Sequence, residues 1–183
     1  MNNDRIIMGI DPGTNLMGYA LLRVVGKKPE ILISGVLDLK KLGDPYLKLQ
    51  RIFKRTLQVI DEYQPDELAI ESQFFGKNVQ SMLKLGRAQG VCIAAALQRN
   101  IPIFEYAPKK IKLAVTGTGT ASKEQMATLM ERYFNIPNFP TSPDETDAIA
   151  IALCHFFQAN PILGAKKASS WADFVKKNPD RVK

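Results

Sequence analysis

The order of apolar patterns along the 183 residues predicts one α/β domain, a mixed five-stranded sheet flanked by helices. Three strand-like runs follow one another closely near the start of the chain, which favours an antiparallel meander. Two short apolar runs come later, each separated from the preceding strand by a helical pattern, and such crossovers add strands in parallel. Hydrophobic residues make up 45% of the chain, enough for a sizeable core.

The first strand is predicted over residues 5–11, an apolar run that Pro12-Gly13-Thr14 interrupts as a tight turn. The next two strands are predicted over 17–25 and 30–38. Residues 26–29, which begin with Gly and end with Pro, form their turn.

A helix is predicted over 44–64, because apolar residues recur there at three- and four-residue steps. These residues are Tyr46, Leu49, Phe53, Leu57 and Ile60. Pro65 ends the helix, and 67–71 is a short buried strand.

A long helix is predicted over 79–99, with small and apolar residues on or near one face: Val79, Met82, Leu83, Gly86, Gly90, Ile93 and Leu97. Each internal glycine weakens a helix by about 1 kcal/mol relative to Ala. We therefore expect this face to pack closely, either on the sheet or on a second subunit.

The fifth strand is predicted over 101–106, and Pro108 opens a short helix to about Val115. After a Gly/Thr-rich loop, Ser122 begins a helix that ends at Phe134, with Gln125 completing a capping box. A last helix, apolar on nearly all sides, is predicted over 143–158.

Residues 1–160 are thus expected to form the domain, and 161–183 a basic tail. Within the tail, Trp171, Phe174 and Val175 have the spacing of a short amphipathic helix, but a disordered tail fits equally.

The formal net charge is +7, which suits a partner rich in phosphate but also ordinary solubilising lysine. No apolar run is long enough to span a membrane and no signal peptide is recognisable, so we expect a soluble, cytoplasmic protein. Cys92 and Cys154 lie in apolar helical surroundings and are expected to be reduced core thiols. His155 is expected to be a packed histidine and not a metal ligand.

Four acidic residues lie in or beside segments that should be buried: Asp11, Glu71, Asp144 and Asp147. Asp11 and Glu71 end strands, and Asp144 and Asp147 lie three apart on one helix face. A buried carboxylate is costly without a partner, and none of the four has Lys or Arg beside it in the sequence. Mg²⁺ or Mn²⁺ suits an all-oxygen ligand set, whereas no Cys/His cluster suits zinc.

Taken singly, each acid has a plainer explanation. Asp-Pro-Gly after a strand is a common turn, Glu71 could end a strand in solvent, and Asp144 could cap a helix. Asp147 is the hardest to explain this way, because an apolar helix follows it directly.

Four long segments in order resemble the RuvC family of bacterial Holliday junction resolvases. They are GIDPGTNLMGYAL, AIESQFFGKNVQSMLKLGRAQGV, PIFEYAPKKIKLAVTGTGTASKEQM and DETDAIAIALCH, and the resemblance runs from about residue 5 to 158. It implies a ribonuclease H-like fold and a homodimer that cuts two opposed strands of a four-way DNA junction. It also implies RuvA and RuvB as branch-migration partners.

In that family, the acids that bind two Mg²⁺ ions match Asp11, Glu71, Asp144 and Asp147. The third position is His in some members and is Asp144 here. The resemblance further implies phosphodiester hydrolysis with 5′-phosphate and 3′-hydroxyl products.

The resemblance also places Lys112 and Lys123 near DNA phosphates, with Lys123 able to offset charge in the transition state. Phe74 matches an aromatic residue that stacks on bases, although it could instead pack onto the long helix, as we expect for Phe75. Further phosphate contacts are expected from Lys77, Asn78, Lys84 and Arg87.

Three other functions are alternatives to junction cleavage. A YqgF-type relative acting on RNA shares the fold, and a DNA-binding protein without catalysis would share the surface. An actin-like ATPase also begins with a strand and an acidic glycine turn, but it needs a second such motif, which this chain lacks.

Overall fold

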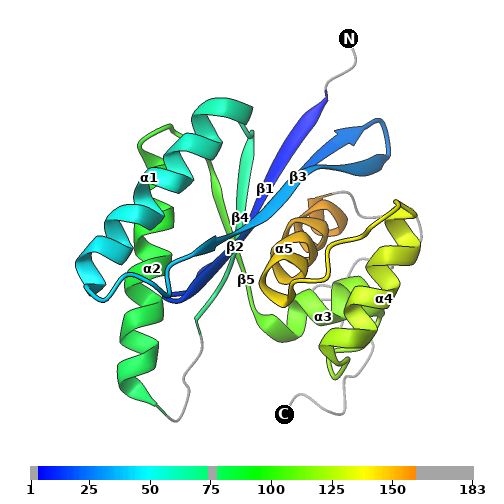
Figure 1. The fold of residues 1–183 in the computed structure, drawn as a ribbon. Coiled ribbons are helices and arrows are strands. Elements are labelled where there is room, and N and C mark those ends of the chain that lie inside the picture. Colours follow the sequence, from blue (N-terminus) through cyan, green and yellow to red (C-terminus); the bar gives the residue numbers. More distant parts are fainter. Residues whose placement is uncertain (1–3, 74–77, 160–183) are drawn as a thin grey trace, which may run out of the picture.

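The computed structural model describes residues 4–73 and 78–159 as one mixed five-stranded sheet between two layers of helices (Figure 1). The strands lie in the order β3-β2-β1-β4-β5. Strand β1 pairs antiparallel with β2 and parallel with β4, β2 pairs antiparallel with β3, and β4 pairs parallel with β5. The predicted fold class is confirmed. The strands are β1 Arg5–Asp11, β2 Leu16–Val25, β3 Lys28–Asp38, β4 Glu67–Glu71 and β5 Ile103–Tyr106.

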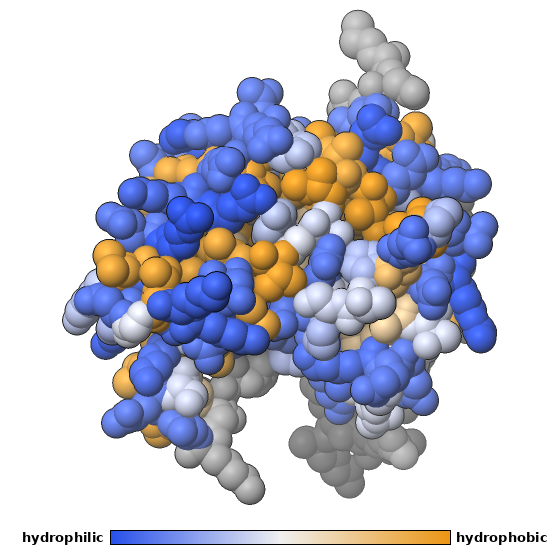
Figure 2. Space-filling view, viewed as in Figure 1, coloured by the Kyte–Doolittle hydropathy of each residue, from blue (hydrophilic) through white to orange (hydrophobic). Residues whose placement is uncertain are grey.

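Helices α1 (Pro45–Tyr63) and α2 (Val79–Leu97) cover one face of the sheet (Figure 1). Helix α5 (Pro143–Ala159) lies across the other face, flanked by α3 (Pro108–Thr116) and α4 (Lys123–Phe134). Hydrophilic residues cover most of the face drawn in Figure 2, with hydrophobic patches between them. Within 4–73 and 78–159, no helix is both long enough and apolar enough to cross a membrane.

The predicted element boundaries differ from the observed ones by at most two residues. Strand β3 begins at Lys28, earlier than predicted, because Pro29 can lie in an edge strand, where its missing N–H breaks no ladder bond. Strand β5 begins only at Ile103, because the Ile101 N–H still closes the end of α2 on the carbonyl of Ala96. The predicted capping box of Ser122 and Gln125 is present. The predicted tail, 161–183, lies outside the described residues.

Strand β1 is buried on both faces, which explains its unbroken apolar run. Met8 and Ile10 pack with α1 and α2, whereas Ile7 packs on the α5 side. Since side chains alternate along a strand, Asp11 shares the α5 face with Ile7 and Gly9. Glu71 follows the same rule in β4, because Ala69 belongs to the core on the α5 side.

Two glycines let α5 approach the sheet closely. A Cβ at Gly9 would lie 2.3 Å from the Ala148 carbonyl oxygen, and one at Gly18 would lie 1.8 Å from that of Asp144. Neither contact is possible for a residue with a side chain unless the helix moves away. Gly9 and Gly18 thus fix the height of the first turns of α5 above β1 and β2.

The apolar spacing predicts the buried faces of α1 and α2 only in part: Ile60 is buried and Leu49 and Ile93 pack against the core as predicted, but other positions differ. Tyr46 of α1 is 70% exposed, and the buried positions are Ile52, Thr56, Val59 and Ile60. In α2, Val79, Leu83 and Leu97 are exposed, and nothing lies within 4 Å of a Cβ at Gly86 or Gly90. The residues that face the core are Ala88, Gln89, Cys92, Ala95 and Ala96. The prediction that the glycine face of α2 packs on the sheet is therefore wrong. The face that is buried consists mainly of small residues, because α2 lies close against the sheet and α1.

Both cysteines are free and buried, as predicted. His155 is a packed residue: its Nδ1 lies 2.7 Å from the Tyr106 hydroxyl and its Nε2 lies 3.0 Å from a Glu67 oxygen. Burial lowers the pKa of His155, and the hydrogen bond to Glu67 opposes that shift. The imidazole joins the far end of α5 to β4 and β5.

Replacing Gly9 by Ala should lower the free energy of unfolding by about 2–3 kcal/mol, because the added methyl group overpacks the contact with α5. Urea unfolding followed by circular dichroism measures this change. Gly43→Ala is the matched control, since a Cβ at Gly43 meets nothing within 4 Å. Equal stability of the two variants would show that α5 does not depend on the close approach at Gly9.

Candidate active site

The four predicted acids line one cavity of about 450 Å³ at the carboxyl ends of β1 and β4. Asp11 and Glu71 reach it from these neighbouring parallel strands, whose register pairs Ile10 with Ile70. Asp144 and Asp147 reach it from the first turns of α5. Acids far apart in the sequence therefore face one space because α5 crosses the ends of both strands.

The cavity concentrates negative charge. Burial raises the pKa of Asp11 from 3.8 to about 7, and Glu71, Asp147 and Asp144 add to the shift, in that order. Burial also raises the pKa of Glu71, with a further contribution from Asp147. Both carboxylates are thus destabilised in their charged forms, the condition that a bound cation relieves.

Lys123 is the nearest cation to these acids in the structure. It is the first residue of α4, and its Nζ lies 2.5 Å from Oδ2 of Asp147. This hydrogen bond raises the pKa of Lys123, while the positive charge of Lys123 partly opposes the rise in the pKa of Asp11 and of Glu71. The Lys123 side chain is 62% exposed, so the pair contributes little stability and can exchange. Lys112 of α3 also lines the cavity and lowers the pKa of Glu71.

The chemistry of the ligand set fits Mg²⁺ or Mn²⁺, since every candidate ligand is a carboxylate. Within 4–73 and 78–159, however, no three acidic, imidazole or thiol groups are already close enough together to hold an ion. Mutual repulsion among the carboxylates opposes a closer cluster, and Lys123 already occupies one oxygen of Asp147. The acids share a cavity without forming a closed ligand shell.

The other predicted contact residues have different positions. Lys84 and Arg87 of α2 line a second groove, which adjoins the acidic cavity through Leu85. Asn78 caps α2, its Oδ1 accepting from the Ser81 N–H at 3.0 Å. Phe74, Phe75 and Lys77 lie outside the described residues.

Gln89, a residue not predicted from the sequence, holds the end of β4 in place. Its Nε2 donates to the backbone oxygen of Glu71 at 3.1 Å and to a Glu105 carboxylate oxygen at 2.9 Å. A polar residue on the buried, alanine-rich side of α2 could have pointed to Gln89. That side is recognised as buried only in the folded structure. Gln73, which also lines the cavity, gave no signal in the sequence.

Comparison with known proteins bears directly on this site. The family model described as crossover junction endodeoxyribonuclease RuvC matches residues 7–155. The protein of that name from Bacteroides fragilis is 57% identical over 182 residues, which cover 98% of this chain and 97% of the relative.

Solved structures agree with the sequence comparison. The fold resembles Thermus thermophilus RuvC in complex with a Holliday junction substrate, with a TM-score of 0.79 and 31% identity over 85% of this chain and 94% of that one. The yeast mitochondrial Holliday junction resolvase shares the fold, with a TM-score of 0.60 and 17% identity over 84% of this chain and 80% of that one. A family match across most of the chain, a relative of the same length and a shared fold lead to one conclusion: the chain belongs to the RuvC family of crossover junction endodeoxyribonucleases.

Proposed function

We propose that this protein resolves four-way DNA junctions by symmetric paired nicks in recombination and repair, as a homodimer in the bacterial cytoplasm. The observation that carries the proposal is the acidic cavity, where four carboxylates from β1, β4 and α5 lie beside Lys123. Family membership supports the reaction class, and the solved complex of a relative with a Holliday junction supports the substrate.

In the proposed site, Asp11, Glu71, Asp144 and Asp147 hold two Mg²⁺ ions, for which Mn²⁺ can substitute. Such a pair makes water nucleophilic at neutral pH and stabilises the oxygens of an in-line displacement. The new bond joins the water oxygen to phosphorus, and the bond from phosphorus to the 3′ oxygen breaks. The water gives up a proton and the 3′ oxygen receives one, which leaves 5′-phosphate and 3′-hydroxyl ends.

The residues around the acids position the reacting phosphate. Lys123 can release Asp147 when a cation takes its place, and its ammonium group then donates to a phosphate oxygen as charge builds up there. Gln89 keeps the Glu71 backbone in register with β5. Lys112 supplies a second positive charge within the same cavity.

The remaining proposed DNA contacts lie between residues 74 and 87 of the sequence. They are Phe74, which we propose stacks on bases, together with Lys77, Asn78, Lys84 and Arg87. The groove lined by Lys84 and Arg87 supports this path, because it adjoins the catalytic cavity. The net charge of +7 favours binding of the DNA phosphates along this path.

Helix α2 also supports the proposed homodimer. Its outer face carries two glycines and three exposed apolar residues, Val79, Leu83 and Leu97. A two-fold interface there would present two catalytic cavities to a two-fold symmetric junction. RuvA and RuvB remain the proposed partners in branch migration.

Asp11→Asn and Asp147→Asn should each reduce Mg²⁺-dependent cleavage of a synthetic four-way junction at least about 100-fold, because each removes a charged ligand. Denaturing gels of end-labelled strands measure the nicks, with an RNA–DNA hybrid and single-stranded RNA as competing substrates. Glu131→Gln, on the exposed side of α4, is the control with the same loss of charge. Wild-type cleavage by Asp147→Asn would exclude the proposed metal site, and preferred cleavage of RNA would exclude the junction.

Asp11→Asn should stabilise the metal-free protein at pH 8 on the order of 2 kcal/mol, because the folded state then no longer holds a charged buried carboxylate. Folding raises the pKa of Asp11, so the Asp11 carboxyl group destabilises the folded state only as the pH rises. This destabilisation is absent below about pH 4 and complete above about pH 7. The gain should accordingly shrink as the pH falls between these values. Thermal unfolding in EDTA measures it, and Mg²⁺ should then stabilise the wild type more than the variant. A variant less stable than the wild type at pH 8 in EDTA would contradict this account.

Leu83→Glu should convert the dimer to monomer, because it places a charge on the outer face of α2, where Leu83 is 60% exposed. Sedimentation velocity measures the change. Leu129→Glu, at a 40% exposed position of α4, is the matched control and should remain dimeric. A Leu83→Glu protein that stays dimeric would place the interface elsewhere.

A further inference from the structure

Helix α1 carries positive charge without compensation over most of its length. Between Pro45 and Ile60 it holds Lys48, Arg51, Lys54 and Arg55 and no acidic residue. A surface helix ordinarily mixes both signs at spacings that form pairs. Here no carboxylate in 4–73 or 78–159 lies within salt-bridge distance of any of these four cations.

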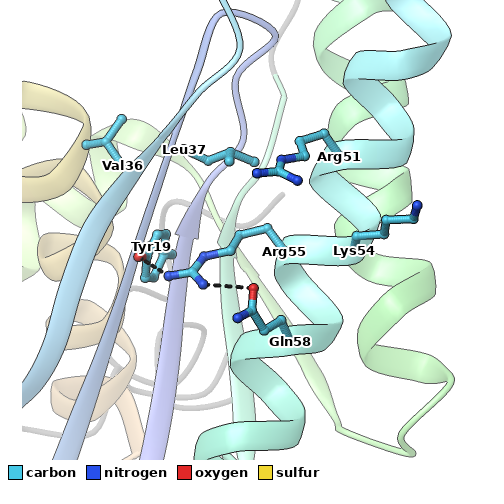
Figure 3. Close-up of a pocket in the computed structure, with 7 residues that line it drawn as sticks. All are labelled: Tyr19, Val36, Leu37, Arg51, Lys54, Arg55 and Gln58. Atoms are coloured by element: carbon cyan, nitrogen blue, oxygen red, sulfur yellow. Dashed lines mark hydrogen bonds between the residues drawn. The ribbon is translucent and has the colours of Figure 1, made fainter.

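Three of the four cations, Arg51, Lys54 and Arg55, line a pocket of about 270 Å³ between α1 and the sheet. Figure 3 shows the guanidinium groups of Arg51 and Arg55 extending from α1 toward β2 and β3, whereas the Lys54 ammonium group points away from them. The rest of the lining comes from Tyr19, Val36, Leu37 and Gln58, so that no acid among the described residues lines the pocket. The pocket therefore has positive charge on one wall and apolar side chains on the other.

Arg55 is held rigidly in this pocket. It donates to the Tyr19 hydroxyl and to Oε1 of Gln58, the latter at 3.0 Å, and its guanidinium carbon lies 4.8 Å from the centre of the Tyr19 ring (Figure 3). Gly35 makes room for that ring, since a Cβ there would lie 2.6 Å from the Tyr19 hydroxyl. The donors that Arg55 does not use are thus already fixed in place, which lowers the entropy lost when an anion binds.

Arg51 lies one helical turn before Arg55, so the two like charges repel each other. Since the Oε1 of Gln58 accepts from Arg55, its amide nitrogen remains a donor beside them. Two guanidinium groups and an amide donor around a small space match the oxygens of a phosphate group.

We propose that this pocket binds one backbone phosphate in an arm of the DNA substrate, outside the catalytic cavity. This inference rests on the proposed function. Continuity with the active site favours DNA over an acidic protein segment: Lys48 donates to Asn15 at 2.9 Å, in the turn whose Pro12 and Gly13 line the catalytic cavity. From Lys48 to Arg55 the helix rises about 10 Å, which is compatible with successive phosphates of one strand.

The test compares two substitutions that remove the same charge from the same helix, Arg51→Gln and Lys54→Gln. Both residues line the pocket, but the Arg51 guanidinium extends toward the sheet, whereas the Lys54 ammonium group points away from the two guanidinium groups (Figure 3). Binding of a four-way junction is measured by fluorescence anisotropy over a series of salt concentrations, in Ca²⁺ to prevent cutting. Arg51→Gln should weaken binding about fivefold and reduce the slope of log K against log salt by about one, as expected for one lost phosphate contact. Lys54→Gln should change the slope by much less.

Cleavage by Arg51→Gln at saturating junction should keep the wild-type rate, since the pocket lies outside the catalytic cavity. Arg55→Lys keeps the charge but loses the paired N–H donors of the guanidinium group, and it should bind the junction as weakly as Arg51→Gln. Thermal unfolding checks that this variant is folded. Equal salt slopes for Arg51→Gln and Lys54→Gln would overturn the phosphate site, including the case in which an acidic protein is the true occupant. A wild-type protein that neither bound nor cut the junction would instead overturn the proposed function, and this site with it.

Discussion

The close approach of α5 to β1 and β2 is the contact on which the rest of the site depends. Gly9 and Gly18 leave no room for a side chain beneath Ala148 and Asp144, so the first turns of α5 lie directly on the two strands. Ser34 of β3 reinforces this position by donating to Glu145 at 2.6 Å. Because the helix lies so low, Asp144 and Asp147 face the same cavity as Asp11 and Glu71.

That arrangement has an electrostatic cost, which bound cations would relieve in the proposed function. Burial and three neighbouring carboxylates bring the pKa of Asp11 to about 7. The only salt bridge that offsets this charge within the described residues is the exposed contact of Lys123 with Asp147, which is weak enough to be exchanged. A protein that keeps such a cavity is suited to divalent cations, and a basic exterior is suited to the polyanion on which those cations act. The proposed phosphate pocket of α1 would apply the same electrostatic principle outside the acidic cavity.

Periodicity predicted the existence of the helices well but their buried faces poorly. In α1 the predicted Ile60 is buried and Leu49 packs against the core, but Tyr46 is exposed and the fully buried positions include Ile52, Thr56 and Val59. In α2 the large apolar residues lie outside, and alanines lie inside. Which face is buried depends on how near the helix lies to its neighbours, and close packing selects small side chains over large ones. The spacing of residues within one helix carries no information on that distance.

The sequence by itself determined the strands and helices, the mixed five-stranded sheet that follows from their succession, and the four acids as the unusual feature. Those inferences depend on local patterns and on chain connectivity, both of which are written along the chain. Only the tertiary structure decided that Lys123, distant in the sequence, pairs with Asp147, that Gln89 holds Glu71, and that Arg51 and Arg55 face a pocket of their own. Each of these contacts joins elements that meet only after the chain has folded, so their physical basis is the packing distance between elements and not any property of the segments taken alone.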